Sequence, residues 1–119
     1  PRSPFVAVTN AYGVAAHSIP WNLPGEDVLG ATVSAVALII RYTAIASAGT
    51  FSLRVRDRTT TEDVAEITAI AAGTSLIASG VGENWPDDST KDIEIEVLHT
   101  TGVAGNSFTL QNLTLVAVL

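Results

Sequence analysis

The chain has 119 residues, a net charge of -6 and 47% apolar side chains. This length suits one domain, and so many apolar side chains argue against disorder. The acidic balance argues against nucleic-acid binding, and the absence of cysteine excludes disulfides, thiolate catalysis and cysteine-held metal. Only 15% of the residues are charged, which is low for a free soluble domain.

No segment has the pattern of a membrane span or a targeting signal. The longest apolar run, residues 33–40, has about half of the ~20 residues that a spanning helix needs, and Arg41 ends it. The first four residues lack the apolar stretch of a signal peptide. We therefore expect no membrane partner.

Strands are favoured over helices, because Thr, Val and Ile are abundant and turn residues recur at short intervals. A short arm, residues 1–4, is expected to precede a single domain over residues 5–119. A loop with Pro-Gly at its turn covers residues 21–27, and a second loop covers residues 80–90. Strands are predicted at residues 5–9, 14–19, 33–45, 50–57, 75–78, 92–99 and 107–118.

Residues 58–80 fit two structures. Asp63 and Glu66 have the spacing of a helix capping box, and apolar residues follow at helical intervals. Residues 64–70, however, are half β-branched and lie between predicted strands, which favours a strand with a short helix as the alternative. About eight short strands joined by turns are typical of an all-β fold, an antiparallel β-sandwich or jelly roll.

Two predicted strands are apolar on both faces. A half-exposed antiparallel strand normally alternates apolar and polar residues, so an outer face made of these strands is expected to meet a partner. The alternative is that loops of the same chain cover it. In residues 33–42 one face carries Val36, Leu38, Ile40 and Tyr42, and the other carries Val33, Ala35, Ala37 and Ile39. In the last strand Leu113, Leu115, Ala117 and Leu119 oppose Thr114, Val116 and Val118.

Charged side chains form two rows. The inward residues Phe51, Leu53 and Val55 alternate with a basic row, and Ile93, Ile95 and Val97 alternate with an acidic row. If the two strands are neighbours, the rows pair across the sheet; if they are not, each row is a patch for an oppositely charged partner, which includes a second copy. The rows are Arg54, Arg56 and Arg58, and Asp92, Glu94 and Glu96.

Residues for catalysis or metal binding are few. His17 and His99 lack metal-ligand spacing, and the chain has no nucleophile-elbow motif or phosphate-binding loop. Glu83, Asp87 and Asp88 carry oxygens that suit Ca²⁺, but their spacing favours solvated turn carboxylates. We expect a non-enzyme that has no cofactor and no metal.

Both tryptophans lie in loops that contain proline. Trp21 and Trp85 are therefore candidates for sugar-stacking platforms or anchors in a protein interface. The alternative is that each ring folds back and covers one end of the domain.

The C-terminal third resembles the closing strands of carbohydrate-binding jelly-roll modules of the galactose-binding-like fold. The resemblance is carried by Trp85 and by residues 93–97, 102–105 and 108–115, and residues 42–55 are similar to the middle hairpin of that family. It implies a jelly roll and affinity for sugars. Gln111 stands where the family often has an Asp that helps to hold Ca²⁺, so the resemblance does not imply calcium here.

Modules of this fold also occur as accessory proteins of phage particles. Together with the low charge and the apolar outer face, this favours a virion structural protein: an oligomeric capsid decoration or cement subunit at the capsid surface. Its expected partners are the major capsid protein and other copies of itself. The alternatives are a carbohydrate-binding module and a phage tail or fibre subunit. The candidate interface residues are Pro1, Arg2, Pro4, Trp21, Arg54, Arg56, Arg58, Trp85, Asp92, Glu94 and Glu96.

Overall fold

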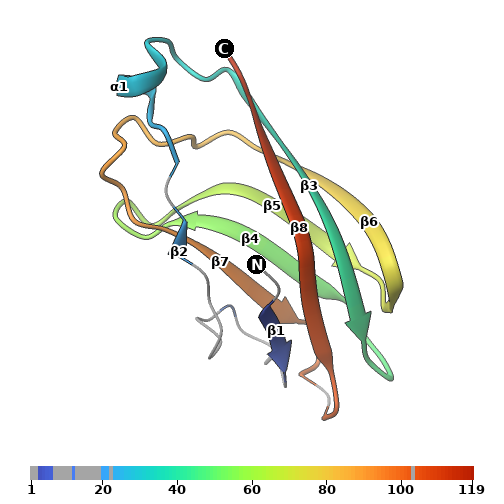
Figure 1. Cartoon of the computed structure of the whole chain (residues 1–119). Helices are drawn as coiled ribbons and strands as arrows, with labels where there is room; N and C mark the ends of the chain where they lie inside the picture. Colours follow the sequence, from blue (N-terminus) through green and yellow to red (C-terminus); the bar gives the residue numbers. More distant parts are fainter. Residues whose placement is uncertain (1–2, 7–11, 13–19, 22, 103) are drawn as a thin grey trace.

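The computed structural model describes residues 3–6, 12, 20–21, 23–102 and 104–119 (Figure 1). These residues form strands and one four-residue helix, which lies at one end of the molecule (Figure 1). The elements are β1 (Ser3–Val6), β2 (Pro20–Trp21), α1 (Glu26–Leu29), β3 (Ala35–Ile45), β4 (Phe51–Asp57), β5 (Glu62–Ile70), β6 (Gly73–Gly82), β7 (Ile93–His99) and β8 (Ser107–Val118).

The described strands form one antiparallel sheet in the order β1-β8-β3-β6-β5-β4-β7-β2. The six long strands, β3 to β8, curl into a half-barrel in which β8, β3 and β6 stand against β5, β4 and β7 (Figure 1). Strands β5 and β6 join the two halves through a single backbone pair, Glu66 with Val81. The all-β antiparallel class is confirmed. The eight-stranded sandwich is not confirmed, because the described strands are connected into one curled sheet.

Residues 58–80 contain strands, as the β-branched composition predicts. Asp63 does not cap a helix; its carboxylate accepts a hydrogen bond of 2.8 Å from Nη1 of Arg56 on the neighbouring strand. Strand β6 is longer than the predicted segment 75–78 and continues through Gly80 and Gly82. Glycine usually ends a predicted strand, but here both glycines lie where the backbone of β5 approaches closely.

The predicted loop of residues 21–27 holds the unpredicted helix α1. Its position is set by the later loop: backbone N–H groups of Glu26 and Asp27 donate to the carbonyls of Pro86 and Asp87, each at 3.0 Å. Gly25 N–H donates to Oγ of Ser89 at 2.8 Å. The two loops therefore form one end of the molecule.

The N-terminal strand begins two residues before the predicted segment 5–9. Ser3 and Pro4, assigned to a free arm by the prediction, pair with Leu110 and Thr109 of β8. Residues 7–9 and the predicted strand 14–19 lie outside the described residues.

The core lies between the two halves of the curled sheet, and the inward faces predicted from alternation are confirmed. The ring of Phe108 lies 5.4 Å from the ring of Tyr42 and 5.3 Å from that of Phe51, centroid to centroid, which ties β3, β4 and β8 together. Burial of these large apolar side chains between the two halves is the main contribution that stabilises the curled sheet. Leu53, Val55, Ile93, Ile95 and Val97 are buried as predicted, and on β3, whose inner face alternation does not specify, the buried side chains include Val36, Leu38 and Ile40.

Candidate functional site

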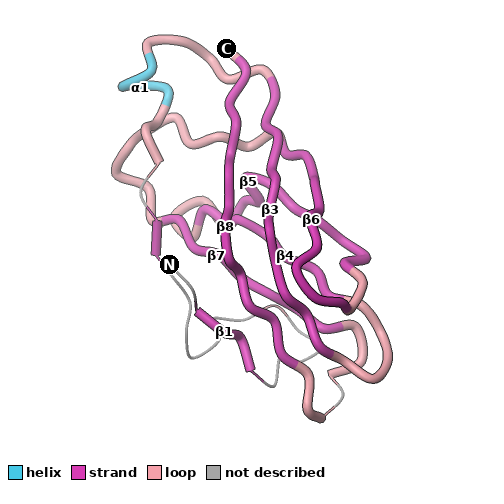
Figure 2. Tube along the Cα trace, turned by 45° about the vertical axis from the view of Figure 1, so that its right-hand side comes forward, coloured by secondary structure: helices cyan, strands magenta, loops and turns pink. Residues whose placement is uncertain are grey.

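The described strands expose an apolar surface on β6, β3 and β8, three strands that lie side by side (Figures 1 and 2). We call it the apolar outer face. Isolated exposed apolar residues are ordinary, whereas these residues lie on three paired strands. Its large exposed side chains, with their exposed fractions, are Ile39 (45%), Ile77 (65%), Val81 (77%), Val116 (43%) and Val118 (48%).

Backbone register makes this face contiguous. Ala37 lies between Val81 of β6 and Val116 of β8, so one row crosses all three strands. Ala35 pairs with Val118 in the next row on the same side. Since side chains directly opposite in a sheet are about 5 Å apart, these residues form one surface.

Two residues depart from the face on which alternation groups them. Val33, grouped with Ala35, Ala37 and Ile39, is buried, because it precedes β3 and its N–H donates to the carboxylate of Glu26. Leu119, grouped with Leu113 and Leu115, is exposed beyond the end of β8. Ile77 and Val81 also belong to this face, although the sequence did not identify them as surface residues. Both lie on β6, which is longer than the predicted segment 75–78.

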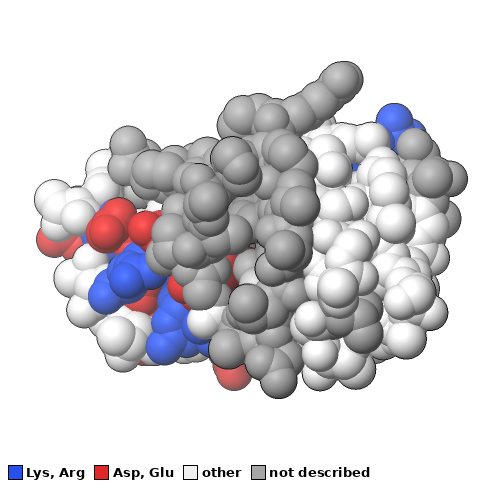
Figure 3. Space-filling view, turned by 90° about the horizontal axis from the view of Figure 1, so that it is seen from below, with Lys and Arg blue, Asp and Glu red and all other residues white. Residues whose placement is uncertain are grey.

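Charge is almost absent from this surface. Strands β6 and β8 contain no charged residue, and β3 contains only Arg41. Arg41 lies beside a shallow groove of about 260 Å³ that is also lined by Ile39, Ile77 and Asn112. Figure 3 shows charged side chains gathered on one part of the molecule and a broad uncharged area on another. The apolar outer face explains the low charged fraction of the chain.

The basic and acidic rows lie on neighbouring strands and pair, as one of the two alternatives predicts. Arg54 is opposite Glu96, and Arg56 is opposite Glu94 in the β4–β7 register. Nε of Arg54 lies 2.8 Å from Oε1 of Glu96. Glu96 is only 4% exposed, although the alternation places it on the outer side. The ion pair between Arg54 and Glu96 is therefore mostly shielded from water.

The remaining charges extend this network. Nη1 of Arg58 lies 2.8 Å from Glu94 and 3.6 Å from Glu96. Arg56 pairs with Asp63 of β5, whereas Asp92 contributes backbone hydrogen bonds with Arg58 and Thr59. All three arginines of the basic row thus form ion pairs within the sheet, two of them with Glu94 and Glu96 of the acidic row.

Tyr12 covers this network and was not identified from the sequence. Its ring lies 3.9 Å from the guanidinium carbon of Arg54, a cation–π contact. Its hydroxyl donates to Oε2 of Glu66 at 2.9 Å. Burial is the main cause that raises the pKa of Tyr12, and the hydrogen bond to Glu66 and its negative charge raise this pKa further. A lone tyrosine in a loop carries no sequence signal for such a contact.

This arrangement predicts a loss of stability in alkali. The native pKa of Tyr12 lies above the ordinary value of 10.0, so the native state keeps a proton that the unfolded state loses. The contribution of Tyr12 to the free energy of unfolding is therefore constant below about pH 10 and falls as the pH rises above it. Burial also raises the pKa of Tyr42, whose hydroxyl donates to the Ala71 carbonyl. We expect Tyr12→Phe to reduce this alkaline loss by about half or more, since only Tyr42 remains.

Urea unfolding at a series of pH values measures this effect. At neutral pH, Tyr12→Phe costs about 1 kcal/mol for the lost hydrogen bond. An alkaline slope identical to that of the unchanged chain would contradict the assignment.

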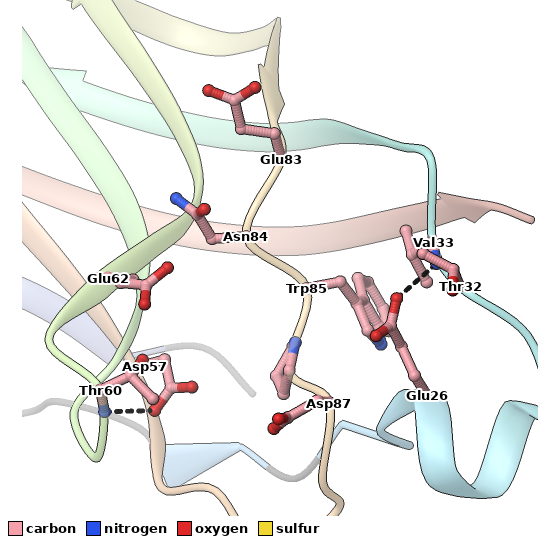
Figure 4. A pocket seen from close by; sticks show the side chains of 11 residues that line it. Glu26, Thr32, Val33, Asp57, Thr60, Glu62, Glu83, Asn84, Trp85 and Asp87 are labelled. Atoms are coloured by element: carbon pink, nitrogen blue, oxygen red, sulfur yellow. Dashed lines mark hydrogen bonds between the residues drawn. The ribbon is translucent and has the colours of Figure 1, made fainter.

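Trp85 lines an open pocket of about 340 Å³ at the loop end of the molecule (Figure 4). The indole N–H donates to the Pro24 carbonyl at 2.8 Å, and the ring packs against the core. Trp85 therefore covers one end of the domain, which is one of the alternatives predicted for a tryptophan in this loop. Its pocket is acidic, since Glu26, Asp57, Glu62, Glu83 and Asp87 line it.

Several of these carboxylates already have partners. Asp57 accepts hydrogen bonds from the N–H groups of Thr59 and Thr60, and Asp87 lies 3.6 Å from Lys91. The N–H of Thr90 donates to Asp88 and lowers its pKa. Among the residues that the structure describes, no group of three or more His, Asp and Glu side chains could hold a metal ion.

His99 has a structural environment. It is fully buried, with its ring 4.6 Å from the ring of Phe51 at a steep angle. Nδ1 accepts hydrogen bonds from the backbone N–H groups of Thr101 and Gly102, which leaves the proton on Nε2. His99 thereby organises the turn before β8. His17 lies outside the described residues.

The remaining candidate residues are at the N-terminal side. Pro4 is part of β1, and Trp21 pairs through its backbone with Ile93. Pro1 and Arg2 lie outside the described residues. The structure thus brings together the charged rows and places Trp85 in the acidic pocket at the loop end of the molecule.

Comparison with protein-family models and with curated proteins finds no match to this chain. No helix in the described ranges is long and apolar enough to cross a membrane. Function is therefore inferred from the surfaces described above.

Proposed function

We propose that this chain is a non-enzymatic structural protein, a phage capsid decoration or cement subunit that binds the virion surface and stabilises the shell. The apolar outer face of β6, β3 and β8 is the observation that supports this proposal. A jelly-roll arrangement is part of the same proposal. The partners are the major capsid protein and other copies of the chain.

The mechanism is thermodynamic. A subunit that binds the assembled shell and not its separated components favours assembly by mass action. Covering exposed apolar side chains contributes roughly 25 cal/mol for each Å² removed from water. A face without acidic residues suits this task, because a chain of net charge -6 would otherwise repel an acidic shell.

Quantitative mass spectrometry of the native material tests the proposal. Many copies in a constant ratio to one dominant shell protein would support a decoration or cement role. A few copies with tail proteins would favour a tail or fibre subunit. Recovery without any shell protein would contradict the proposal and favour the carbohydrate-binding alternative, for which Trp85 at an open acidic pocket is the supporting observation.

Charge placed on the apolar outer face should weaken binding without unfolding the chain. We expect Val81→Lys to weaken binding to purified shells at least tenfold, because an ammonium group cannot be desolvated there. Val28→Lys is the matched control, since Val28 is comparably exposed but lies on α1. Co-sedimentation with the shells measures both variants. Equal weakening by the two would show that this face is not the contact.

A further inference from the structure

Among the Lys and Arg side chains that the structure describes, only Arg41 has no partner. Arg54, Arg56 and Arg58 form ion pairs with carboxylates, and so does Lys91. Arg41 is exposed near the middle of β3. Acidic side chains outnumber basic ones 12 to 6 in this chain, so a cation that meets none of them is placed apart from the acidic groups.

Arg41 lies on the apolar outer face, in a row that crosses all three strands. It is opposite Ile77 of β6 and opposite Asn112 of β8 in the backbone register, and all three residues are exposed. Ile39 is the next outward residue of β3. The shallow groove of about 260 Å³ is lined by these side chains. It therefore has an apolar wall, formed by Ile39 and Ile77, beside a single cation.

Asn112 adds a second hydrogen-bond donor next to Arg41. Its Oδ1 accepts a hydrogen bond of 3.4 Å from the hydroxyl of Thr114, and its amide nitrogen donates to no group within the described residues. The unused polar groups of Arg41 and Asn112 are thus N–H donors. Side chains directly opposite in a sheet are about 5 Å apart, so the two can reach one anion that has two acceptor oxygens. A carboxylate is such an anion.

A carboxylate on a protein fits this groove better than a polyanion does. Nucleic acids are bound through several phosphate contacts, whereas this face supplies one cation in a chain of net charge -6. The apolar wall also requires an apolar group beside the anion, and an acidic residue with an aliphatic neighbour provides both. Arginine is the basic residue favoured in protein interfaces, because its guanidinium is weakly hydrated and binds carboxylates through two hydrogen bonds.

We propose that Arg41 and Asn112 form the binding site for an acidic side chain of the partner protein, an Asp or Glu whose aliphatic neighbour fills the groove between Ile39 and Ile77. The identity of that partner, the shell protein, rests on the proposed function. The apolar outer face supplies area without direction, whereas an ion pair at one point of it restricts where on the shell the subunit can dock.

Binding of Arg41→Gln to purified shells tests this site. We expect the affinity to fall roughly tenfold or more, because the partner's carboxylate stays partly desolvated after it loses its cation. Lys91→Gln is the matched control: it removes the same charge, but Lys91 pairs with Asp87 at the loop end of the molecule. This control should weaken binding less than about twofold. Equal weakening by the two variants would overturn the proposal, since only the net charge would then matter.

A model peptide tests the groove without the shell. Acetyl-Leu-Glu-Leu-amide carries one carboxylate between two aliphatic side chains, and acetyl-Leu-Gln-Leu-amide is its uncharged counterpart. In nuclear magnetic resonance titrations of the full chain with up to about 10 mM peptide, we expect the Glu peptide to shift the amide signals of Arg41, Ile77 and Asn112. It should bind roughly fivefold or more tightly than the Gln peptide, and Arg41→Gln should remove this preference. Equal binding of the two peptides, or no shift with either, would overturn the proposal.

The two experiments distinguish this proposal from the proposed function. If Val81→Lys weakens shell binding and Arg41→Gln does not, the apolar outer face is the contact and the carboxylate site is wrong. If the unchanged chain does not bind shells but prefers the Glu peptide through Arg41, the proposed function is wrong and the carboxylate site stands.

Discussion

Gly82→Ala should destabilise the protein by at least ~3 kcal/mol and abolish folding if the chain has no greater reserve. An added Cβ at this position would overlap three backbone atoms of β5: the carbonyl carbon and oxygen of Val64 and Cα of Ala65. Backbone atoms of a paired strand cannot move aside as a flexible side chain can. The substitution therefore separates β5 from β6.

The effect is large because of where Gly82 lies. Strands β5 and β6 are joined by one backbone pair, and they connect the two halves of the curled sheet. Gly80 is placed similarly, since its Cβ would meet the carbonyl of Glu66. We expect loss of this junction to expose the core between the halves.

Urea unfolding followed by circular dichroism measures this loss, and failure to accumulate soluble protein counts as the same outcome. Gly30→Ala is the matched control: φ is +72°, but no atom lies within 4 Å of an added Cβ. It should cost only about 1 kcal/mol, for backbone strain alone. Equal costs for the two variants would contradict the close approach of β5 and β6.

Arg54→Met is expected to cost about 3 kcal/mol, because it leaves the buried carboxylate of Glu96 without its nearest cation. It also removes the cation–π contact with Tyr12. Arg58→Met should cost less than about 1 kcal/mol, since Arg58 is far more exposed and its ion pairs are screened by water.

The double variant Arg54→Met with Glu96→Leu separates charge from packing. Replacing both members of a buried pair by apolar groups removes the unpaired charge, so most of the lost stability should return. Urea unfolding of the single and double variants gives the coupling between the two residues. No recovery in the double variant would show that Arg54 stabilises the sheet through packing alone.

The two charged rows show how far sequence could predict the site. Alternation places Arg54 and Arg56 on one face of a strand and Glu94 and Glu96 on one face of another, and this is a local property. Whether the rows meet depends on strand order, which involves a separation of some forty residues. Sequence therefore left pairing and partner binding as alternatives, and the β4–β7 register decided between them.

The apolar outer face was predicted in part. The apolar residues on both faces of β3 and β8 identified Ala35, Ala37, Val116 and Val118. Strand β6, however, was predicted only over residues 75–78, before its glycines. The contribution of Val81 was missed for that reason. Glycine weakens local strand propensity, and only the closeness of the β5 backbone shows why β6 continues through it.

By itself the sequence determined the all-β class, most strand positions and the inward side of the strands that alternate apolar and polar residues, because β-branched composition and a period of two are local properties. Only the tertiary structure decided that the strands form one curled sheet, that the two charged rows lie on neighbouring strands and which face of β3 and β8 lies in the core. These features depend on which distant strands pair, and burial of the common core selects that pairing.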